Sequence, residues 1–474
     1  LFLRQADGAL KQVPFGFPRA DVARAFPECA CGERVGYRAS LFPPLPQLSG
    51  VTFCCQINDE WHQFSANLET RDVQSFAFDA STQAPAEVIE QLRAATEEPL
   101  EAHFRRALAA RPGLTLRLDI INKCNLRCVM CHFSDDAIFK RPTRQLTADE
   151  FQHMFDEIGE HVGHVVLSCG DEPLTSKFLP DIIRYLAREH PQVAIEFCTN
   201  AMLMRAPIRR LIMETGVARL MFSIDAVSKP LLESIRVGAR YEQLVGNIMA
   251  LRDLRTRLGR TFPEFVFNFV MMNRNIHEAP AFVRMAKELG AAVIDFRHLV
   301  PIETYFDPQE LLSLYPAKFN HYREKIAAAA KAAEVNYYIP EPFPTNETWL
   351  PQNEPAVDWS AFENVRAEQD DIDIGAVPAA APRLGEEGTV AEEFGATFCN
   401  RPFSEIMIRD QEDVLPCPWH NNVLGRLSEG KTLAEIFHGE KFAALRRNML
   451  RAEGDPHCRE CPIKTAHLPT AKNT

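Results

Sequence analysis

Three cysteines lie close together with the spacing C-x3-C-x2-C, namely Cys124, Cys128 and Cys131. Thiolates at this spacing can bind one metal centre, or they can pair with one another. A closed iron–sulfur or zinc site uses four protein ligands, so three thiolates leave one metal position open to another molecule. An open position is typical of a catalytic metal site. A zinc knuckle, or cysteines without a shared role, is the alternative.

Four further cysteines follow near the end of the chain: Cys399, Cys417, Cys458 and Cys461. Residues 403–409 and 414–418 predict two strands of a hairpin, which would bring the first two of these cysteines toward the same end. A helical stretch opened by Thr432 and Glu435, a capping box, can return the last two to that end. Four thiolates would make a closed site, and the spacing alone does not distinguish iron–sulfur from zinc.

Strand and helix patterns alternate between the two cysteine groups. Apolar runs predict strands at residues 115–121, 164–169, 193–199, 218–224, 265–272 and 293–300. The helical stretches between them carry capping signals, such as Thr147 with Glu150 and a terminal Gly216. This alternation predicts an α/β fold with parallel strands, and we infer an open, partial (β/α)6 barrel. The three-cysteine motif follows the first strand, so it would lie on the rim where such barrels do chemistry.

Polar residues near the ends of the other strands would share that rim. They are Gly170, Asp171 and Glu172, then Thr199 and Asn200, then Ser223, Asp225 and Arg236, and finally Asn268. A glycine turn lets the backbone approach a ligand, and a carboxylate can pair with a cation. Taken one by one, these residues also fit simple turns or solvated surface positions. We interpret Cys169 and Cys198, near the same rim, as small buried hydrophobic residues.

Together these motifs resemble the radical S-adenosylmethionine (SAM) superfamily. The resemblance implies that the three-cysteine motif holds a 4Fe–4S cluster, with the amino and carboxylate groups of SAM on the fourth iron. It also implies that an electron from the cluster cleaves SAM to a 5′-deoxyadenosyl radical, which takes a hydrogen atom from the substrate. An electron donor such as a flavodoxin or ferredoxin is then the expected partner.

The match to this family has two departures. Residues 170–173 resemble its Gly-Gly-Glu-Pro segment, which receives the SAM ammonium, but Asp171 stands where a second glycine is common. Met130 stands before the last cysteine of the motif, where an aromatic residue is common, and we expect it beside the cofactor. Arg236 resembles the family's arginine near the SAM carboxylate. We expect the other polar rim residues to contact the ribose or carboxylate of SAM.

The C-terminal segment resembles the SPASM-type extension of radical SAM enzymes in its one-cluster form. The resemblance rests on Arg401-Pro402-Phe403, Pro416-Cys417, Leu424-Gly425, residues 433–437 and the closing C-x2-C. It implies that the four C-terminal cysteines hold a second 4Fe–4S cluster.

The sequence predicts five segments: a β-rich module (1–84), a helical connector (85–112), the barrel (113–303), a helical segment with a Pro- and acid-rich linker (304–397), and the iron–sulfur extension (398–474). Residues 340–395 are interpreted as a tether, with a lid over the active site as the alternative. Residues 16–37 resemble a small β-sandwich module, which we associate with glycosyltransferases and methyltransferases of surface-polysaccharide gene clusters.

The cysteines of this first segment are weaker metal-site candidates. Cys29, Cys31, Cys54 and Cys55 could share an ion, but adjacent residues of a strand point to opposite faces. We therefore expect no metal there.

Composition limits the function further. The chain has 474 residues with 46% hydrophobic and 24% charged residues, which is ordinary for two or three soluble domains. A net charge of −12 argues against nucleic-acid binding. We see no signal peptide and no apolar stretch long enough to cross a membrane. A cytoplasmic location, where the 13 cysteines stay reduced or bind metal, is expected.

Two substrate classes fit an enzyme of this kind: a sugar or sugar-nucleotide, and a peptide. The β-rich first segment favours the sugar, because peptide-modifying members often carry a winged-helix domain there. A non-catalytic iron–sulfur scaffold or sensor is the alternative from another class, but it would not need the SAM-binding strand ends. The sequence does not identify a catalytic acid, base or radical-quenching residue.

Overall fold

The computed structural model describes residues 2–4, 10–12, 50–57, 60–67, 77–79, 114–300, 306–350, 356–368, 374, 401–418, 420, 422–449 and 455–459. The chain divides into two compact units. One comprises Leu1–Pro112, Glu386–Ser404 and His438–Glu460, and the other comprises Gly113–Gly385, Glu405–Phe437 and Cys461–Thr474.

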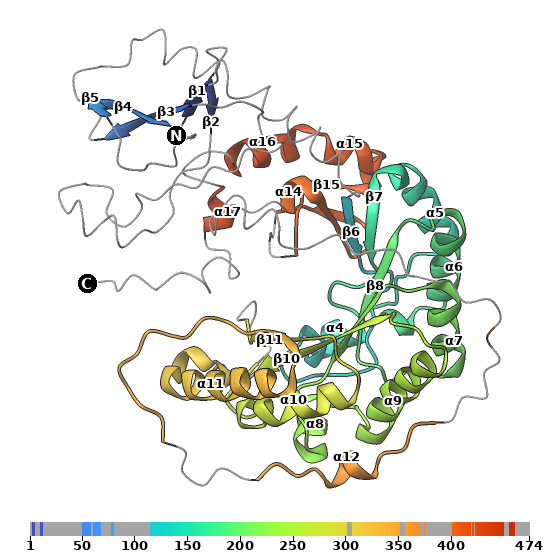
Figure 1. Cartoon of the computed structure of the whole chain (residues 1–474). Helices are drawn as coiled ribbons and strands as arrows, with labels where there is room; N and C mark the ends of the chain where they lie inside the picture. Colours follow the sequence, from blue (N-terminus) through green and yellow to red (C-terminus); the bar gives the residue numbers. More distant parts are fainter. Residues whose placement is uncertain are drawn as a thin grey trace. The chain divides into compact units, whose positions relative to one another are not determined.

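Parallel strands form the centre of the larger unit. In sheet order they are β6 (Leu114–Leu118), β7 (Val162–Val166), β8 (Ala194–Thr199), β9 (Arg219–Ser223), β10 (Glu264–Met271), β11 (Val293–His298) and β12 (Asn336–Tyr338) (Figure 1). The six predicted strands and their parallel order are confirmed, and β12 adds another parallel strand beside β11. The partial α/β barrel is therefore the fold of this unit.

Helices cover the outer side of the curved sheet (Figure 1). They are α5 (Ala148–Asp156), α6 (Leu179–Glu189), α7 (Ala206–Thr215), α8 (Lys229–Ile235), α9 (Tyr241–Arg257), α10 (Ala279–Glu288) and α11 (Pro316–Ala333), with the short α4 (Asp136–Lys140) near the cysteine motif. Short 3-10 turns lie at His132–Ser134, Gly159–His161, Pro173–Thr175, Ile276–Glu278, Pro308–Glu310, Leu312–Leu314 and Leu427–Glu429. The predicted capping box of Thr147 and Glu150 is confirmed, and Gly216 ends α7 with φ +69°.

The sheet continues beyond β6 into the C-terminal segment. The hairpin predicted there is confirmed as β13 (Glu405–Arg409) and β14 (Asp413–Leu415), followed by β15 (Gly425–Arg426) and helix α15 (Leu433–Phe437). β13 pairs in parallel with β6, so the barrel sheet, the hairpin and β15 form one ten-stranded sheet. An ion pair of 2.9 Å between the side chains of Arg117 and buried Glu405 joins the two strands.

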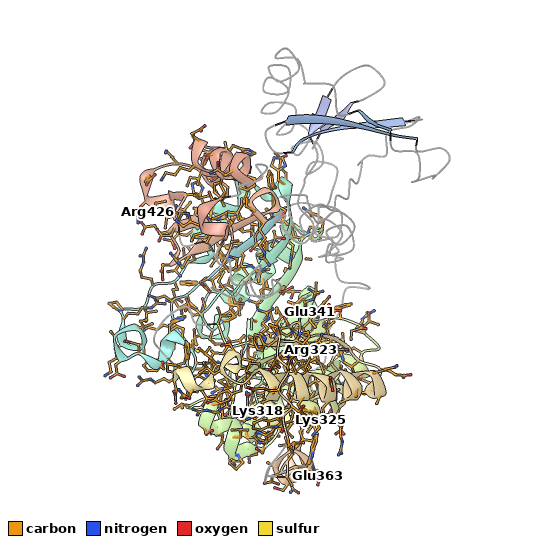
Figure 2. All side chains as sticks on the ribbon, turned by 90° about the vertical axis from the view of Figure 1, so that its left-hand side faces the viewer. Lys318, Arg323, Lys325, Glu341, Glu363 and Arg426 are labelled. Atoms are coloured by element: carbon orange, nitrogen blue, oxygen red, sulfur yellow. The ribbon has the colours of Figure 1, made fainter. Side chains whose placement is uncertain are left out.

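Residues 340–350 and 356–368 pack on the outer helices and form a strap. Asn320 of α11 exchanges two hydrogen bonds with the backbone of Phe343, and Arg323 lies beside Glu341 (Figure 2). Further along, α12 (Ser360–Asn364) contacts α9, and fully buried Arg209 binds the carboxylate of Glu368 at 2.9 Å. The described part of the predicted tether is therefore docked on the helices.

The smaller unit contains an antiparallel sheet. Its strands are β1 (Phe2–Arg4), β2 (Leu10–Gln12), β3 (Gly50–Ile57), β4 (Glu60–Asn67) and β5 (Ala77–Asp79), in the order β2-β1-β3-β4-β5. The β-rich character is as predicted, but the described residues form a single sheet, so the β-sandwich stays a prediction. Helices α14 (Arg401–Ser404), α16 (Glu440–Met449) and α17 (Pro456–Arg459) also belong to this unit.

Several predictions on the first segment fall outside the part of the chain that the structure describes. These are the module at residues 16–37, the helical connector at 85–112, and Cys29 and Cys31. Among the described helices, none is long and apolar enough for a membrane crossing.

Candidate functional site

The three-cysteine motif forms a loop at the carboxyl end of β6. Cys128 is buried, Cys124 and Cys131 are partly exposed, and all three are free thiols. Two backbone hydrogen bonds hold the loop against the end of α8, from the amide of Arg127 to Val237 O and from that of Val129 to Ile235 O, both at 2.9 Å. The motif is thus fixed on the rim, as its position after the first strand predicted.

Nitrogen atoms of three other side chains lie against the three sulfurs. The distances are 3.8 Å from Asn200 Nδ2 to Cys124 Sγ, 3.9 Å from Arg236 Nη1 to Cys128 Sγ, and 3.9 Å from His132 Nδ1 to Cys131 Sγ. Burial raises the pKa of Cys128 to about 11, and the Arg236 charge opposes that shift. Because nitrogen donors and cations stabilise thiolates, this set of groups fits a cluster bound through three sulfurs.

Glu172 joins the loop after β7 to the end of β8. Its backbone amide donates to Lys123 O at 2.9 Å, which ties it to the cysteine loop. Its buried carboxylate accepts hydrogen bonds from Thr199 Oγ1 at 2.7 Å, Asn200 N at 2.8 Å and Leu174 N at 3.2 Å. Burial raises its pKa to about 7. The structure therefore brings Glu172, Thr199 and Asn200 together beside the cysteine loop.

Asp225 and Arg236 form a buried ion pair on the same rim. Arg236 Nη2 lies 2.6 Å from Asp225 Oδ2, and the other carboxylate oxygen accepts the amide of Val270 at 2.8 Å. Since Arg236 also reaches Cys128 Sγ, its guanidinium bridges the end of β9 and the cysteine loop. Met130 packs beside this region against a small apolar cluster that includes Ile235.

Cys198 lies between Ser223 and Asn268, and its interpretation as a buried hydrophobic residue is wrong. Its sulfur lies 3.3 Å from Ser223 Oγ and 3.8 Å from Asn268 Nδ2, and its side chain is partly exposed. Burial raises its pKa, so the thiol keeps its proton. Asn268 Oδ1 is buried without a hydrogen-bond partner, which leaves an acceptor available to a ligand.

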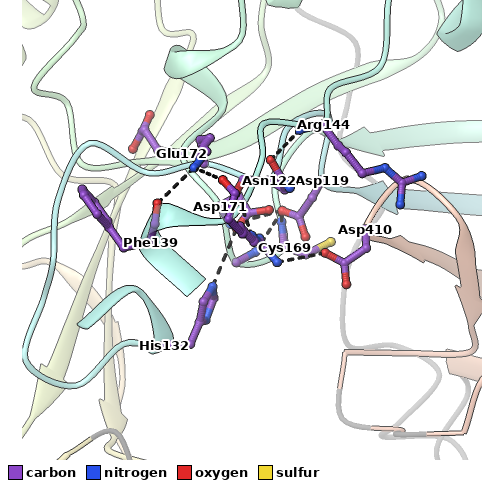
Figure 3. Close-up of polar contacts among 12 residues, drawn as sticks. Asp119, Asn122, His132, Phe139, Arg144, Cys169, Asp171, Glu172 and Asp410 are labelled. Atoms are coloured by element: carbon purple, nitrogen blue, oxygen red, sulfur yellow. Dashed lines mark hydrogen bonds and ion pairs between the residues drawn. The ribbon is translucent and has the colours of Figure 1, made fainter. Parts of the chain in front are cut away.

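Asp119 is a site residue that the sequence did not reveal. It is buried at the end of β6, and Oδ1 accepts the amides of Cys169 at 2.7 Å, Gly170 at 3.0 Å and Asp171 at 3.2 Å (Figure 3). These bonds fix the glycine turn after β7. The only signal in the sequence was an acidic residue at the end of an apolar strand, five positions before Cys124.

Two family models match the chain. The model of the radical SAM superfamily matches residues 118–286, and the model of the SPASM iron–sulfur cluster-binding domain matches residues 399–462. The chain therefore contains a radical SAM domain and a SPASM-type domain. The two domains imply SAM and two 4Fe–4S clusters as cofactors, as the sequence predicted.

Curated relatives match over part of their length. An AdoMet-dependent heme synthase of Methanosarcina barkeri is 31% identical over 179 residues, which are 38% of this chain and 48% of that protein. A probable GTP 3′,8-cyclase of Methanococcus maripaludis is 25% identical over 189 residues, which are 40% of this chain and 60% of that protein. The chain thus covers less than two thirds of either relative.

Solved structures share the fold. SuiB of Streptococcus suis bound to S-adenosylmethionine is 15% identical with a TM-score of 0.50, covering 80% of this chain and 77% of that chain. SuiB bound to its precursor peptide SuiA is 14% identical with a TM-score of 0.51, covering 84% and 80%. At these identities the likeness shows the fold alone.

Paired charges line the inner strand face of the radical SAM domain. Glu196 lies 3.3 Å from His164 Nε2 and 3.5 Å from Arg219 Nη1, and Arg219 Nε reaches Glu264 at 2.7 Å. Because side chains two residues apart share a strand face, Glu196 lies on the same face as Cys198. The face that leads to the rim is therefore polar, and the carboxylates of Glu196 and Glu264 pair with Arg219.

The SPASM-type cysteines are described in part. Cys417 is buried just after β14, and Cys458 lies in α17. Cys399 and Cys461 fall outside the described residues, so the four-cysteine site stays a prediction.

Proposed function

We propose that this chain is an enzyme that cleaves SAM reductively and abstracts a hydrogen atom from a bound substrate. The observation that carries the proposal is the loop of three free thiols, each with a nitrogen group against its sulfur. When bound, the cluster and SAM supply the electron and the 5′-deoxyadenosyl radical. Ferredoxin or flavodoxin in the cytoplasm is the proposed source of the electron.

The surrounding residues are proposed to orient SAM. Glu172 is proposed to accept from the SAM ammonium, and Arg236 to pair with the SAM carboxylate. Both side chains are buried and close to the cysteine loop, which supports these roles. Thr199 and Asn200 hold the Glu172 carboxylate in place.

The substrate is proposed to be a sugar or sugar-nucleotide. The support is a polar inner strand face that carries Ser223 and Asn268, with the buried Asn268 Oδ1 free to accept a hydrogen bond from a hydroxyl group. Because the nearby charges are already paired, this face suits a polyhydroxylated molecule that makes many neutral hydrogen bonds. The described strands of the first segment form an antiparallel sheet, which is in line with the β-rich module that favoured this choice.

A single anaerobic assay tests both parts of the proposal. With dithionite and SAM, the reconstituted protein should release 5′-deoxyadenosine, and Cys128→Ser should abolish the release because the cluster loses a ligand. Cys54→Ser, in the separate antiparallel sheet, is the matched control and should leave it unchanged. Persistent release in Cys128→Ser would contradict the cluster assignment. Nucleoside-diphosphate sugars should stimulate release above a panel of linear peptides, and stimulation by peptides alone would contradict the sugar assignment.

A further inference from the structure

A chain of polar contacts leads from the cysteine loop to the turn of the C-terminal hairpin. His132 Nδ1 lies 3.9 Å from Cys131 Sγ, and His132 Nε2 lies 3.7 Å from Asp171 Oδ1 (Figure 3). The same Asp171 oxygen lies 3.5 Å from Arg141 Nη2, and Arg141 Nη1 lies 3.2 Å from Asp410 Oδ1 in the β13–β14 turn. Each ring nitrogen of the imidazole thus has a polar neighbour: the sulfur on one side and the carboxylate on the other.

Asp171 is held in place by contacts of its side chain and of its backbone amide. Its side chain is 7% exposed, and its backbone amide donates to buried Asp119. Arg141 is anchored in turn, since its Nε donates to Asn122 O at 3.1 Å. The carboxylate therefore cannot turn away from His132 without breaking contacts on both of its sides.

The imidazole of His132 is also confined by packing. Its ring centroid lies 4.4 Å from that of buried Phe133. A Cβ added at Gly170 would lie 3.4 Å from His132 Cε1, so the ring packs closely over the glycine turn. Packing and the two polar contacts together define one orientation for the ring.

We propose that Asp171 is a positioning residue that holds His132 against Cys131, and that the His132 N–H donated to this sulfur raises the reduction potential of the cluster bound there. The inference rests on the proposed function, because it requires a cluster on the three-cysteine motif. Reduction adds negative charge to a cluster, and a hydrogen bond to a ligand sulfur stabilises that charge. A glycine at position 171, common in the family that the motif resembles, has no side chain to hold an imidazole.

The test is a redox titration of the reconstituted protein, followed by electron paramagnetic resonance. The signal that changes on SAM addition identifies the cluster on the three-cysteine motif. His132→Phe keeps an aromatic ring against Phe133 but removes the donor, so its midpoint potential should become more negative. His132→Gln keeps an N–H donor and should give a potential between those of the wild type and the phenylalanine variant. An unchanged potential in His132→Phe, with the signal intact, would overturn the inference.

A double-mutant cycle shows whether Asp171 acts through His132. In the His132→Phe background, Asp171→Gly removes a negative charge and leaves the Arg141 cation without that partner. Both changes should raise the reduction potential. In the wild-type background, Asp171→Gly also releases His132. The change in reduction potential should therefore be less positive, or even negative. Equal shifts in the two backgrounds would show that Asp171 acts by its charge alone and would overturn its positioning role.

Two controls separate this inference from the proposed function. Glu412→Gln removes a carboxylate from the same turn as Asp410, but Glu412 pairs with Arg144, so the potential should stay unchanged. If Glu412→Gln shifted the reduction potential as much as His132→Phe does, the effect would come from the β13–β14 turn and not from the imidazole, and the inference would be overturned. Absence of any SAM-sensitive signal in the wild-type protein would contradict the proposed function itself, whereas an intact signal with an unchanged potential contradicts only this inference.

Discussion

The carboxylate of Glu172 can accept a hydrogen bond from a ligand in addition to those it accepts from the protein. Its Oε1 accepts two hydrogen bonds, from Leu174 N and Thr199 Oγ1, whereas Oε2 accepts one, from Asn200 N. A carboxylate offers about four lone-pair sites, so one direction at Oε2 remains for a further donor. The structural role in joining two loops is thus compatible with the proposed contact to the SAM ammonium.

Glu172→Gln should weaken SAM binding by roughly 10- to 150-fold, because a charge-assisted hydrogen bond contributes roughly 1.5–3 kcal/mol. The measurement is the SAM dissociation constant of the reconstituted protein, with iron content to show that the cluster is intact. Thr199→Val is the matched control. It removes one hydrogen-bond donor to Glu172 but leaves the carboxylate, so the loss of SAM affinity should be smaller than in Glu172→Gln. Equal affinity of Glu172→Gln and wild type would mean that Glu172 only joins the two loops.

At the scale of elements, aromatic stacking joins the last part of the barrel to the strap. His298 at the end of β11 lies with its ring centroid 4.6 Å from that of Phe319 in α11 and 5.0 Å from that of Phe343 in the strap. Burial lowers the pKa of His298 to about 4. The imidazole is therefore neutral in the folded protein at neutral pH, and protonating it opposes this packing.

The low pKa of His298 predicts a loss of stability in weak acid. In the unfolded chain histidine titrates near pH 6.5, so its stabilising contribution is complete above that pH and declines as the pH falls toward about 4. Between pH 7.5 and 5, the wild-type protein should lose about 2 kcal/mol more than His298→Phe, which keeps a ring but cannot titrate. Urea unfolding of both proteins at the two pH values measures this difference. Equal losses would show that His298 does not contribute to the acid sensitivity.

At the scale of the whole molecule, the C-terminal hairpin belongs to the barrel. β13 covers the edge of β6, and Gln411 in the β13–β14 turn donates to the backbone carbonyl of Asp119 at 3.0 Å. Glu412 and Asp410 of the same turn pair with Arg144 and Arg141. The SPASM-type extension therefore supports the radical SAM site directly, beyond any cluster of its own.

Truncation after residue 397 should therefore damage the first cluster as well as the second. It would expose the edge of β6 and remove the turn that contacts Asp119, so we expect aggregation and loss of SAM cleavage. Removal of residues 1–84, which contribute none of the proposed cluster or SAM contacts, should leave cleavage intact. Iron content and 5′-deoxyadenosine release of both truncated proteins are the measurements. A soluble C-terminal truncation that still cleaves SAM would show that the extension is an independent module.

Local sequence signals were enough to locate the elements of the barrel and the position of the metal site. Apolar periodicity and caps such as Thr147 with Glu150 are local signals, so they located the strands and helices of the barrel and the C-terminal hairpin. The spacing of the three cysteines after the first strand then placed the metal site on the rim, since all strands of a parallel barrel end there.

The distant residues that support this site could not be predicted from the sequence, because they meet only in the folded chain. Arg117 and Glu405 are 288 positions apart, and no local pattern pairs them or predicts that β13 would lie beside β6. Asp119 and Asp171 each look ordinary in the sequence, because their roles come from backbone amides and side chains that folding brings to them. Such contacts depend on packing between separate elements. A single sequence shows which residue types are able to pack together, but it does not show which of them meet.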